Sequence, residues 1–348
     1  MCKWYEEEGR EADGVVSTRV RLARNLRDLP FPTRMTAENR QELNRRVCEA
    51  LERPMAEAGL PLNRVEMDSL SDMQAMAMVE RHCISPEFAR EREGRLLLIS
   101  ENESVSIMLG EEDHIRIQAL LSGLALDEAY TMAGSIDKLL SESLDIAFDK
   151  RLGYLTACPT NLGTGLRASV MLHLPAIESR SAMGAITNMV SKIGLTVRGI
   201  YGEGSDTKAS LYQLSNQVTL GISEEAALSN LKSITGQILQ RERAARKALD
   251  PDKLADMVWR SLGLLCTARI LSGEEFMGLI SAVRLGTYMG IIRTDPAAVA
   301  RLLVDCQPAM LQLSAAGPEN PLPMEAAQRD KVRAAHARKV LGAAVCGQ

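Results

Sequence analysis

Residues 15–22, VVSTRVRL, limit the possible folds of this chain more than any other segment. Small or apolar residues alternate with polar ones, which is typical of a β-strand that is buried on one face only. Ser17, Arg19 and Arg21 fall on the same face of such a strand. The face predicted to be buried comprises Val16, Thr18, Val20 and Leu22. The chain therefore needs a sheet with one covered face and one face that carries arginines.

Further strands and helices follow along the first part of the chain. Short apolar or alternating runs predict strands at residues 95–100, 104–109, 114–118, 153–158, 167–174, 195–201 and 211–220. Apolar residues at helical spacing predict helices over residues 36–58, 127–148, 181–193 and 223–248. This part of the chain is thus a mixture of strands and helices.

The pattern changes at residues 250–252, DPD, where the last of these helices is interrupted. Only helical patterns follow. Ser272 and Asp295 each precede such a pattern and fit N-cap positions. We therefore predict a mixed sheet-and-helix domain over residues 1–249 and a helical domain over residues 250–348.

The composition excludes several classes of function. The net charge of the 348 residues is −4, so the chain lacks the overall basic field of many nucleic-acid-binding proteins. It has no apolar run of about 18 residues, which a membrane span needs, and no N-terminal secretory signal. The seven cysteines and four histidines are scattered without the spacing of metal ligands or of a disulfide framework. We expect a cytoplasmic protein that binds neither nucleic acid nor membrane and has no metal site of its own.

Five arginines stand out because they lie on predicted strands or beside glycine-rich turns. Two positive charges on one strand face repel each other, and an anion between them would relieve the repulsion. The planar fork of a guanidinium matches the oxygens of a phosphate. Each arginine taken alone is equally compatible with a solvated surface position. The set consists of Arg19, Arg21, Arg116, Arg167 and Arg198.

An acidic turn, Glu111-Glu112-Asp113, lies between two of the predicted strands. Three consecutive carboxylates repel one another and need a cationic partner. A guanidinium substrate would be such a partner, because two carboxylates can hold its plane while one accepts its proton. A charged hairpin turn without catalytic function would show the same residues, so the turn alone does not decide between the two interpretations.

Four segments occur in the order that is found in one enzyme family. The stretch 158–167, CPTNLGTGLR, is ten residues long and highly specific. The other three segments are STRVR at 17–21, EEDH at 111–114 and RG at 198–199. In these segments the chain resembles the phosphagen (guanidino) kinases, and the resemblance covers roughly residues 10–245.

The resemblance implies a fold and a branch of the family. Phosphagen kinases have an α+β catalytic fold in which an antiparallel β-sheet is flanked by helices, and here a helical C-terminal domain follows it. Segments similar to the bacterial protein arginine kinases are RHCISP at 81–86, RASVM at 167–171 and RGIYGE at 198–203. This similarity implies an ATP:guanidino phosphotransferase that modifies arginine side chains of proteins, in bacterial stress response and protein quality control.

The resemblance also assigns roles to residues of this sequence. ATP with Mg²⁺ is the implied cofactor, the five arginines would clamp its phosphates, and His82 would lie beside the nucleotide. Glu112 would position and deprotonate the guanidinium, with Glu111 and Asp113 nearby. Cys158 matches the reactive cysteine of the family. The implied nucleotide-binding residues are Ser17, Thr18, Arg19, Val20, Arg21, His82, Arg116, Arg167, Ala168, Ser169, Val170, Met171, Arg198, Gly199, Ile200, Tyr201, Gly202 and Glu203.

Two features bear on the substrate and on the acidic turn. Gly110 stands where the family usually has Asn, which affects a local turn contact but leaves the carboxylates in place.

Only sixteen residues precede Ser17, whereas small-molecule phosphagen kinases carry a helical domain before the equivalent strand. An open site without that lid suits an arginine side chain that a protein presents. We therefore expect protein substrates with exposed arginines.

Near the C-terminus, Arg329 and Arg333 are four residues apart and share one face of a predicted helix, beside Asp330. Two guanidinium groups can take a phosphate while a carboxylate takes a guanidinium, so this face has both chemistries of a phosphoarginine. The segment also resembles the R-D-x-x-R-A motif of the allosteric phosphoarginine pocket in protein arginine kinases, with Ala334 as its last residue. Without the resemblance, a solvated charged face would explain it.

We expect the helical domain to form a homodimer, because its helices carry more apolar residues than a thin appendage needs. These residues include Trp259, Leu262, Leu265, Phe276, Ile280 and Val283. Packing against the first domain is the alternative. The resemblance further implies an activator protein and a Clp-type protease machinery as partners.

Three other functions remain open from the sequence. Gly163-x-Gly165-x-x-Ala168 matches a dinucleotide-binding fingerprint, although that motif opens a helix and a strand is predicted here. A non-catalytic protein that binds phosphoarginine would need the arginines but not an intact acidic turn. A kinase for a small guanidine would share the whole site. The sequence identifies neither the protein substrates nor the ligands of Mg²⁺.

Overall fold

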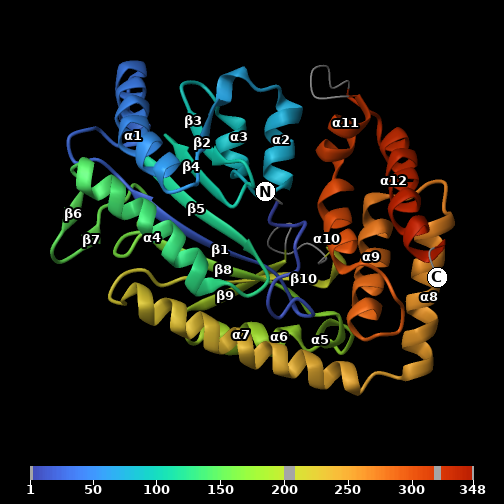
Figure 1. Ribbon diagram of the computed structural model, residues 1–348. Helices are drawn as coiled ribbons and strands as arrows, with labels where there is room; N and C mark the ends of the chain where they lie inside the picture. Colours follow the sequence, from blue (N-terminus) through green and yellow to red (C-terminus); the bar gives the residue numbers. More distant parts are fainter. Residues whose placement is uncertain (1–2, 200–207, 317–322, 347–348) are drawn as a thin grey trace.

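The structure, a computed structural model, describes residues 3–199, 208–316 and 323–346 (Figure 1). Its centre is an eight-stranded sheet with the strand order β2-β3-β4-β5-β1-β8-β10-β9. All neighbouring strands of this sheet pair antiparallel. The strands are β1 (Val15–Arg24), β2 (Leu62–Glu66), β3 (Leu96–Ser100), β4 (Val105–Leu109), β5 (Ile115–Ser122), β8 (Leu166–His173), β9 (Leu195–Gly199) and β10 (Leu211–Asn216), with a separate hairpin of β6 (Phe148–Asp149) and β7 (Gly153–Tyr154). The predicted α+β class with an antiparallel sheet is confirmed.

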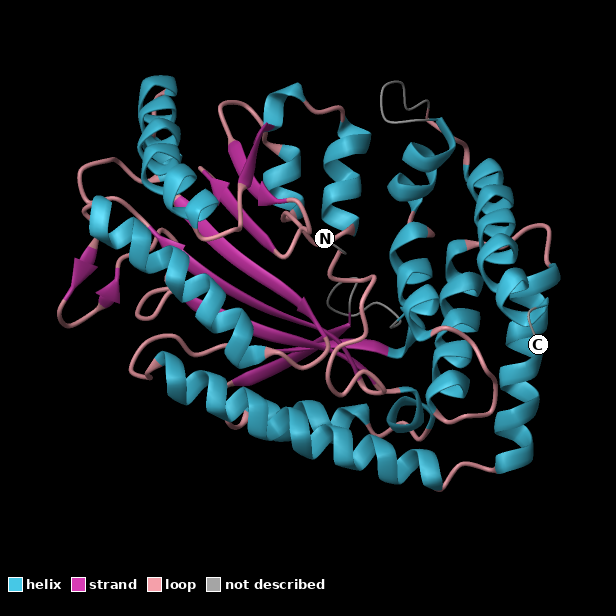
Figure 2. Cartoon of the chain, viewed as in Figure 1, coloured by secondary structure: helices cyan, strands magenta, loops and turns pink. Residues whose placement is uncertain are grey.

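Helices cover both faces of the sheet (Figure 2). On one face, α1, α4 and α7 pack over the apolar side chains of the central strands and form the main hydrophobic core. On the other face lie α2 and α3 and, beyond them, the helices that follow residue 250. The helices are α1 (Ala37–Glu57), α2 (Asp72–Glu80), α3 (Pro86–Arg90), α4 (Leu126–Ser143), α5 (Pro175–Ser179), α6 (Met183–Ser191), α7 (Glu224–Lys247), α8 (Pro251–Thr267), α9 (Gly273–Tyr288), α10 (Pro296–Asp305), α11 (Pro308–Ala316) and α12 (Ala326–Cys346).

The alternation predicted for the first strand holds from Ser17 onwards but not before it. The register of β1 against β8 shifts between Val15 and Ser17, which marks a β-bulge. The extra residue reverses the alternation, so Val15 joins the main core with Val20, while Val16 packs towards the helices after residue 250. The prediction that Val16 shares the buried face of Val20 was wrong for this reason.

Two predicted strands end earlier than their sequence pattern suggests, one at side-chain hydrogen bonds and one at a backbone hydrogen bond. The strand predicted to residue 220 ends at Asn216, whose side chain accepts from the Ala168 amide and donates to the Leu166 carbonyl, and so replaces backbone pairing. The strand predicted over 153–158 stops at Tyr154, because the Leu155 amide turns towards the Ala147 carbonyl. Strand β2 and helices α2 and α3 were not predicted.

The helix starts predicted at Ser272 and Asp295 are confirmed, and a further helix begins after Asp250, where only an interruption was predicted. Asp250, Ser272 and Asp295 each accept hydrogen bonds from backbone amides in the first turn of α8, α9 and α10. These helices, with α12, share a second apolar cluster that also includes Ala209 and Leu211 from the sheet region. Because that cluster spans both parts of the chain, the division near residue 250 remains a prediction.

Most of the apolar residues that motivated the predicted homodimer are buried within this chain. Leu262, Leu265, Phe276, Ile280 and Val283 all belong to the second cluster. Trp259 is 54% exposed, and Met257, Leu264 and Ile270 are exposed as well. Packing within this chain, mainly among the helices after residue 250 and with a few contacts to the first domain, thus accounts for most of the set. In the part of the chain that the structure describes, no helix has the length and apolar character needed to cross a membrane.

Candidate active site

Strand register brings the predicted arginines to one face of the sheet. Arg21 lies opposite Arg167 on β8, and Ala23, on the same face of β1, lies opposite Arg116 on β5. Arg198 on β9 pairs with Gln213, which in turn pairs with Met171, the partner of Ser17. Positions that face each other across antiparallel strands point to the same side of the sheet. Arg19, Arg21, Arg116, Arg167 and Arg198, which we call the arginine clamp, therefore share one face.

Electrostatic repulsion within the arginine clamp is strong. Burial, then the charges of Arg116 and Arg167, lower the pKa of Arg19 to about 10. Burial and the other clamp arginines lower the pKa of Arg21 well below its ordinary value. The Nε of Arg21 is buried without a hydrogen-bond partner. A polyanion would supply acceptors and relieve the repulsion, so the clamp has the chemistry of a phosphate-binding site.

Other residues of the same strands point to the opposite face. Thr18 donates to the Gly123 carbonyl, and Val20, Ala168 and Val170 are fully buried in the main core. These four predicted nucleotide-binding residues hold the clamp strands in place, and their side chains do not reach the clamp face. Ser17, Ser169 and Met171 alternate with them and do line the clamp face.

The acidic turn begins at Gly110, where φ is +77° and the amide donates to the His114 carbonyl at 2.9 Å. Asn is the residue that tolerates a left-handed conformation best after Gly. Gly110 therefore serves the turn in the same way as the Asn that the family usually has.

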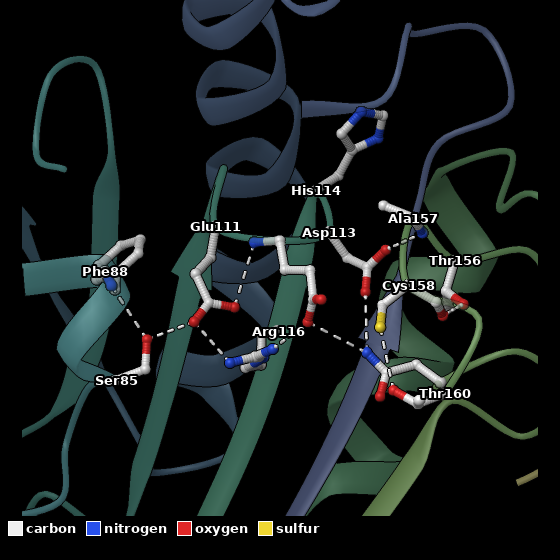
Figure 3. Close-up of polar contacts among 12 residues, drawn as sticks. Ser85, Phe88, Glu111, Asp113, His114, Arg116, Thr156, Ala157, Cys158 and Thr160 are labelled. Carbon is white, nitrogen blue, oxygen red and sulfur yellow. Dashed lines mark hydrogen bonds and ion pairs between the residues drawn. The ribbon is translucent and has the colours of Figure 1, made fainter. Parts of the chain in front are cut away.

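The three carboxylates of the turn have very different surroundings (Figure 3). Glu111 has a side chain that is only 3% exposed, and it accepts from Arg116 at 2.6 Å and from the Ser85 hydroxyl. Asp113 is fully buried and accepts from the Asn25 side chain and the Ala157 amide, both at 2.7 Å. Both carboxylates are thus engaged in holding neighbouring segments.

Glu112 is the open carboxylate of the turn. Its side chain is 43% exposed, with Arg116 at 3.1 Å and the Asn161 amide nitrogen at 3.5 Å. It lines a cleft of about 440 Å³ together with clamp arginines, Thr160 and Asn161. A carboxylate that faces a cleft beside phosphate-binding groups is placed to accept a proton from a bound cation.

Cys158 lies on the loop that closes the other side of this cleft. Its Sγ is 3.0 Å from the Thr160 hydroxyl (Figure 3). The same loop contains Gly163, whose φ of +110° brings it against the Thr219 carbonyl, where a Cβ would stand only 2.2 Å away. After Gly165 the chain enters strand β8, so the glycines do not open a helix as a dinucleotide fingerprint requires.

Comparison with known proteins agrees with this geometry. Residues 42–245 match the family described as ATP:guanido phosphotransferase, C-terminal catalytic domain, and residues 251–345 match the Protein-arginine kinase McsB C-terminal domain. The protein-arginine kinase of Halothermothrix orenii is 46% identical over 316 residues, 90% of each chain. The protein-arginine kinase of Symbiobacterium thermophilum is 45% identical over 98% of this chain and 97% of its own. The chain belongs to the protein-arginine kinase branch of the ATP:guanido phosphotransferases.

Solved guanido phosphotransferases share the fold. A lombricine kinase superposes with a TM-score of 0.57 at 25% identity and covers 69% of both chains. The duplicated taurocyamine kinase from Schistosoma mansoni, with bound transition state analog components, gives a TM-score of 0.59 at 25% identity. It covers 82% of this chain and 46% of its own. The guanidino kinase fold expected from the resemblance is confirmed.

The guanido phosphotransferase fold also places His82 beside the clamp. His82 follows α2 and has φ +62°, a left-handed conformation that Gln118 stabilises by donating to the His82 carbonyl at 2.8 Å. Burial, then the charge of Arg19, lower the pKa of His82 to about 4. The imidazole is therefore neutral at pH 7 and can donate or accept a hydrogen bond.

Several predicted positions lie elsewhere or cannot be placed. Gly199 is the last residue of β9, while Ile200, Tyr201, Gly202 and Glu203 lie outside the described residues. In the C-terminal segment, Arg333 is buried and bonds to the carbonyls of Cys306 and Leu271 and to Asp330. Arg329 donates to the Met324 carbonyl, and Ala334 is buried in the second apolar cluster.

Sequence reasoning missed three side chains of the site. Ser85 holds Glu111, Asn161 bridges towards Glu112, and Glu87 lines the cleft. Asn161 was part of the quoted CPTNLGTGLR motif and Ser85 of the RHCISP segment, so both carried a signal. Glu87 carried none, because its helix α3 was not predicted.

Proposed function

We propose that this enzyme is a protein-arginine kinase, which transfers the γ-phosphoryl group of ATP to the guanidinium of arginine side chains in proteins. The observation that carries the proposal is the position of one open carboxylate, Glu112, beside a clamp of mutually repelling arginines. The clamp binds and neutralises the triphosphate, and the carboxylate faces the place where a guanidinium would lie.

Phosphoryl transfer needs positioning and charge neutralisation more than covalent chemistry. A protonated guanidinium is not nucleophilic, so Glu112 accepts a proton from it as the nitrogen attacks the γ-phosphorus. The new N–P bond forms while the bond between the γ-phosphorus and its bridging oxygen breaks, and ADP leaves with the electron pair of that bond.

The other residues of the site hold the arginine clamp and the loop around Glu112 in position. Glu111 joins Arg116 to Ser85, and so fixes one clamp arginine against α3. Asp113 fixes the loop that carries Cys158, through the Ala157 amide. A thiolate at Cys158 would add negative charge beside the guanidinium.

ATP and Mg²⁺ fit the residues that are present. The unpartnered Nε of Arg21 and the repulsion within the clamp both favour a bound polyphosphate. Mg²⁺ binds mainly through phosphate oxygens, waters and one or two carboxylates. Glu87 and Glu112 are the carboxylates that line the cleft among the described residues. Mg²⁺ supplies charge neutralisation when it is bound.

The relatives favour a protein substrate over a small guanidine. They are named protein-arginine kinase, and the similarity covers nearly their whole length. Their similarity extends through the helical region, which matches a domain named after the same enzymes. A homodimer, a phosphoarginine-sensing segment at residues 329–334, an activator protein and a role in protein quality control are further parts of the proposal.

The test is Glu112→Ala. We expect phosphoarginine formation on a mixture of unfolded proteins to fall by at least about 100-fold, because a general base contributes roughly 10²–10⁴ in rate. ATP affinity should stay within about twofold, since no clamp group is lost. Phosphoarginine is quantified by mass spectrometry under conditions that preserve N–P bonds.

Glu101→Ala is the matched control, because Glu101 is an exposed glutamate in the turn between β3 and β4. Loss of ATP affinity in parallel with activity would contradict the role of Glu112. Phosphorylation of creatine instead of proteins would show that the substrate is a small guanidine.

A further inference from the structure

A second cavity continues the cleft on the side of the clamp away from Asn161. Arg19, Arg21 and Arg116 line both cavities, and the second has a volume of about 570 Å³. Small-molecule sites have volumes of about 300–1,000 Å³. Part of its wall comes from the helical region, through Phe276, Met277, Cys306, Gln307, Pro308 and Arg333.

The walls of the two cavities differ in chemistry. The cleft at Glu112 is lined mainly by arginines and by polar groups such as Thr160 and Asn161. In the second cavity, apolar side chains such as Met108, Met171 and Met277 form most of the wall beyond the clamp, and amides and the carboxylates of Glu80 and Glu87 lie among them. A purine nucleoside has broad apolar faces and a few polar edge atoms, and it matches walls of this kind. A guanidinium needs a free carboxylate. Glu112 lines only the first cleft, whereas Glu80 in the second cavity already accepts from two backbone amides.

We propose that the helical region forms one wall of the nucleoside end of the ATP site, with Met277 and Gln307 in contact with the base or ribose. The inference rests on the proposed function, because it takes the triphosphate to lie on the clamp. The γ-phosphate then lies towards Glu112, and the nucleoside extends into the second cavity, past His82 and towards α9 and the start of α11.

The wall is held firmly against the sheet region. The Glu80 carboxylate, at the end of α2, accepts from the amides of Ala309 and Met310 in α11, both at 2.9 Å. Helices α2 and α11 pack against each other (Figure 1). The Gln307 amide donates to the Leu303 carbonyl at 2.8 Å, with the Met277 sulfur 3.7 Å away. Gln307 and Met277 thus form a fixed surface opposite His82.

A nucleotide in this position would touch both parts of the chain at once. Its phosphates would lie on strands β1, β5 and β8, and its base would lie against α9 and the start of α11. Binding would therefore strengthen the attachment of the helical region to the sheet region, because a ligand that contacts both stabilises their packed arrangement.

The test compares ADP with inorganic tripolyphosphate, which has the phosphates but no nucleoside. Dissociation constants are measured by calorimetry for the wild type, Gln307→Ala and Gln307→Trp. We expect Gln307→Ala to weaken ADP binding roughly fivefold to tenfold, and Gln307→Trp to weaken it more, because the larger ring fills the cavity. Tripolyphosphate affinity should stay within about twofold in both variants.

Gln312→Ala is the matched control, since Gln312 belongs to α11 but lines neither cavity. It should leave both ligands unchanged. Arg19→Ala should weaken both ligands together. Equal effects of the Gln307 variants on ADP and tripolyphosphate, or no effect on either, would overturn the inference. If Gln307→Trp fails to fold, Gln307→Ala decides alone. A wild-type protein that binds no adenine nucleotide would contradict the proposed function instead.

Discussion

Two arginines, one half-buried in the clamp and one buried in the helical region, have opposite surroundings. Arg21 lies among other arginines, and its Nε has no hydrogen-bond partner. Arg333 is 3% exposed and donates to two backbone carbonyls and to the Asp330 carboxylate. A buried charge is expensive unless it is paired. The clamp arginine therefore favours an anionic ligand, whereas Arg333 is already paired within the chain by Asp330 and two backbone carbonyls.

The contrast also bears on the proposed phosphoarginine pocket at residues 329–334. Asp330 pairs with Arg333 at 2.6 Å, and Arg329 donates to the Met324 carbonyl. A phosphoarginine could bind here only if the present hydrogen bonds were broken. Its phosphate would replace the carbonyl oxygens that now accept from an arginine, and its guanidinium would replace Arg333 as the partner of Asp330. Regulation through this segment would thus require a local rearrangement of the first turns of α12 and of the residues that contact them.

The largest effect is expected from substitution of an arginine in the clamp itself. Arg167→Lys keeps the charge but loses the bidentate fork, so we expect kcat/KM for ATP to fall by about 10²–10³. Steady-state kinetics with varied ATP measure the loss. Arg151→Lys, at an exposed arginine of the β6–β7 turn, is the control. Near-normal turnover would remove Arg167 from the clamp.

Replacement by methionine should have opposite effects on stability at the two arginines. Arg333→Met leaves Asp330 and two carbonyls without their donor, and we expect the free energy of unfolding to fall by about 3 kcal/mol. Arg21→Met removes a positive charge that lies among other arginines, and the ligand-free protein should gain about 1 kcal/mol while losing activity. Denaturant titration without nucleotide measures both. A loss of stability in both variants would show that Arg21 is paired in solution.

A smaller effect is expected from pH, through His82. Its pKa in the folded protein is about 4, below the ordinary 6.5, so the unfolded chain binds more protons between these values. Stability should be complete above pH 6.5 and fall as the pH drops towards 4, by about 2–3 kcal/mol from this group. His82→Gln should flatten that part of the stability curve, and an unchanged curve would show that His82 is solvated. His173, which is buried and lines neither cavity, contributes in the same direction and remains in both proteins.

The arginine clamp could be predicted because it depends on short-range alternation and on one specific motif. Arg19 and Arg21 share a strand face by period alone, and the CPTNLGTGLR stretch identified the strand of Arg167. That Arg21 and Arg167 are direct neighbours could not be predicted, because strand pairing depends on tertiary register. The β-bulge between Val15 and Ser17 could not be predicted for the same reason.

The three consecutive carboxylates show a second limit. Glu111, Glu112 and Asp113 look equivalent in sequence, yet their partners come from residues 85, 161 and 25, far along the chain. Burial and hydrogen bonding separate an open base from two carboxylates that hold the turn in place. The wall of the second cavity could not be predicted from the sequence either, because it combines α2 with helices that lie more than two hundred residues later in the chain.

The packing of the N-terminal segment affects the order in which the chain can assemble. Trp4 and Tyr5 form an apolar cluster with Leu120 on β5 and with Val304 on α10, and the Trp4 indole donates to the Arg81 carbonyl. Residues 4 and 5 are synthesised about 300 residues before Val304, which forms part of their packing surface. Such contacts between distant parts of a chain form slowly. The segment therefore stays exposed through most of translation, and its burial is a late step of folding that joins the sheet region to the helices.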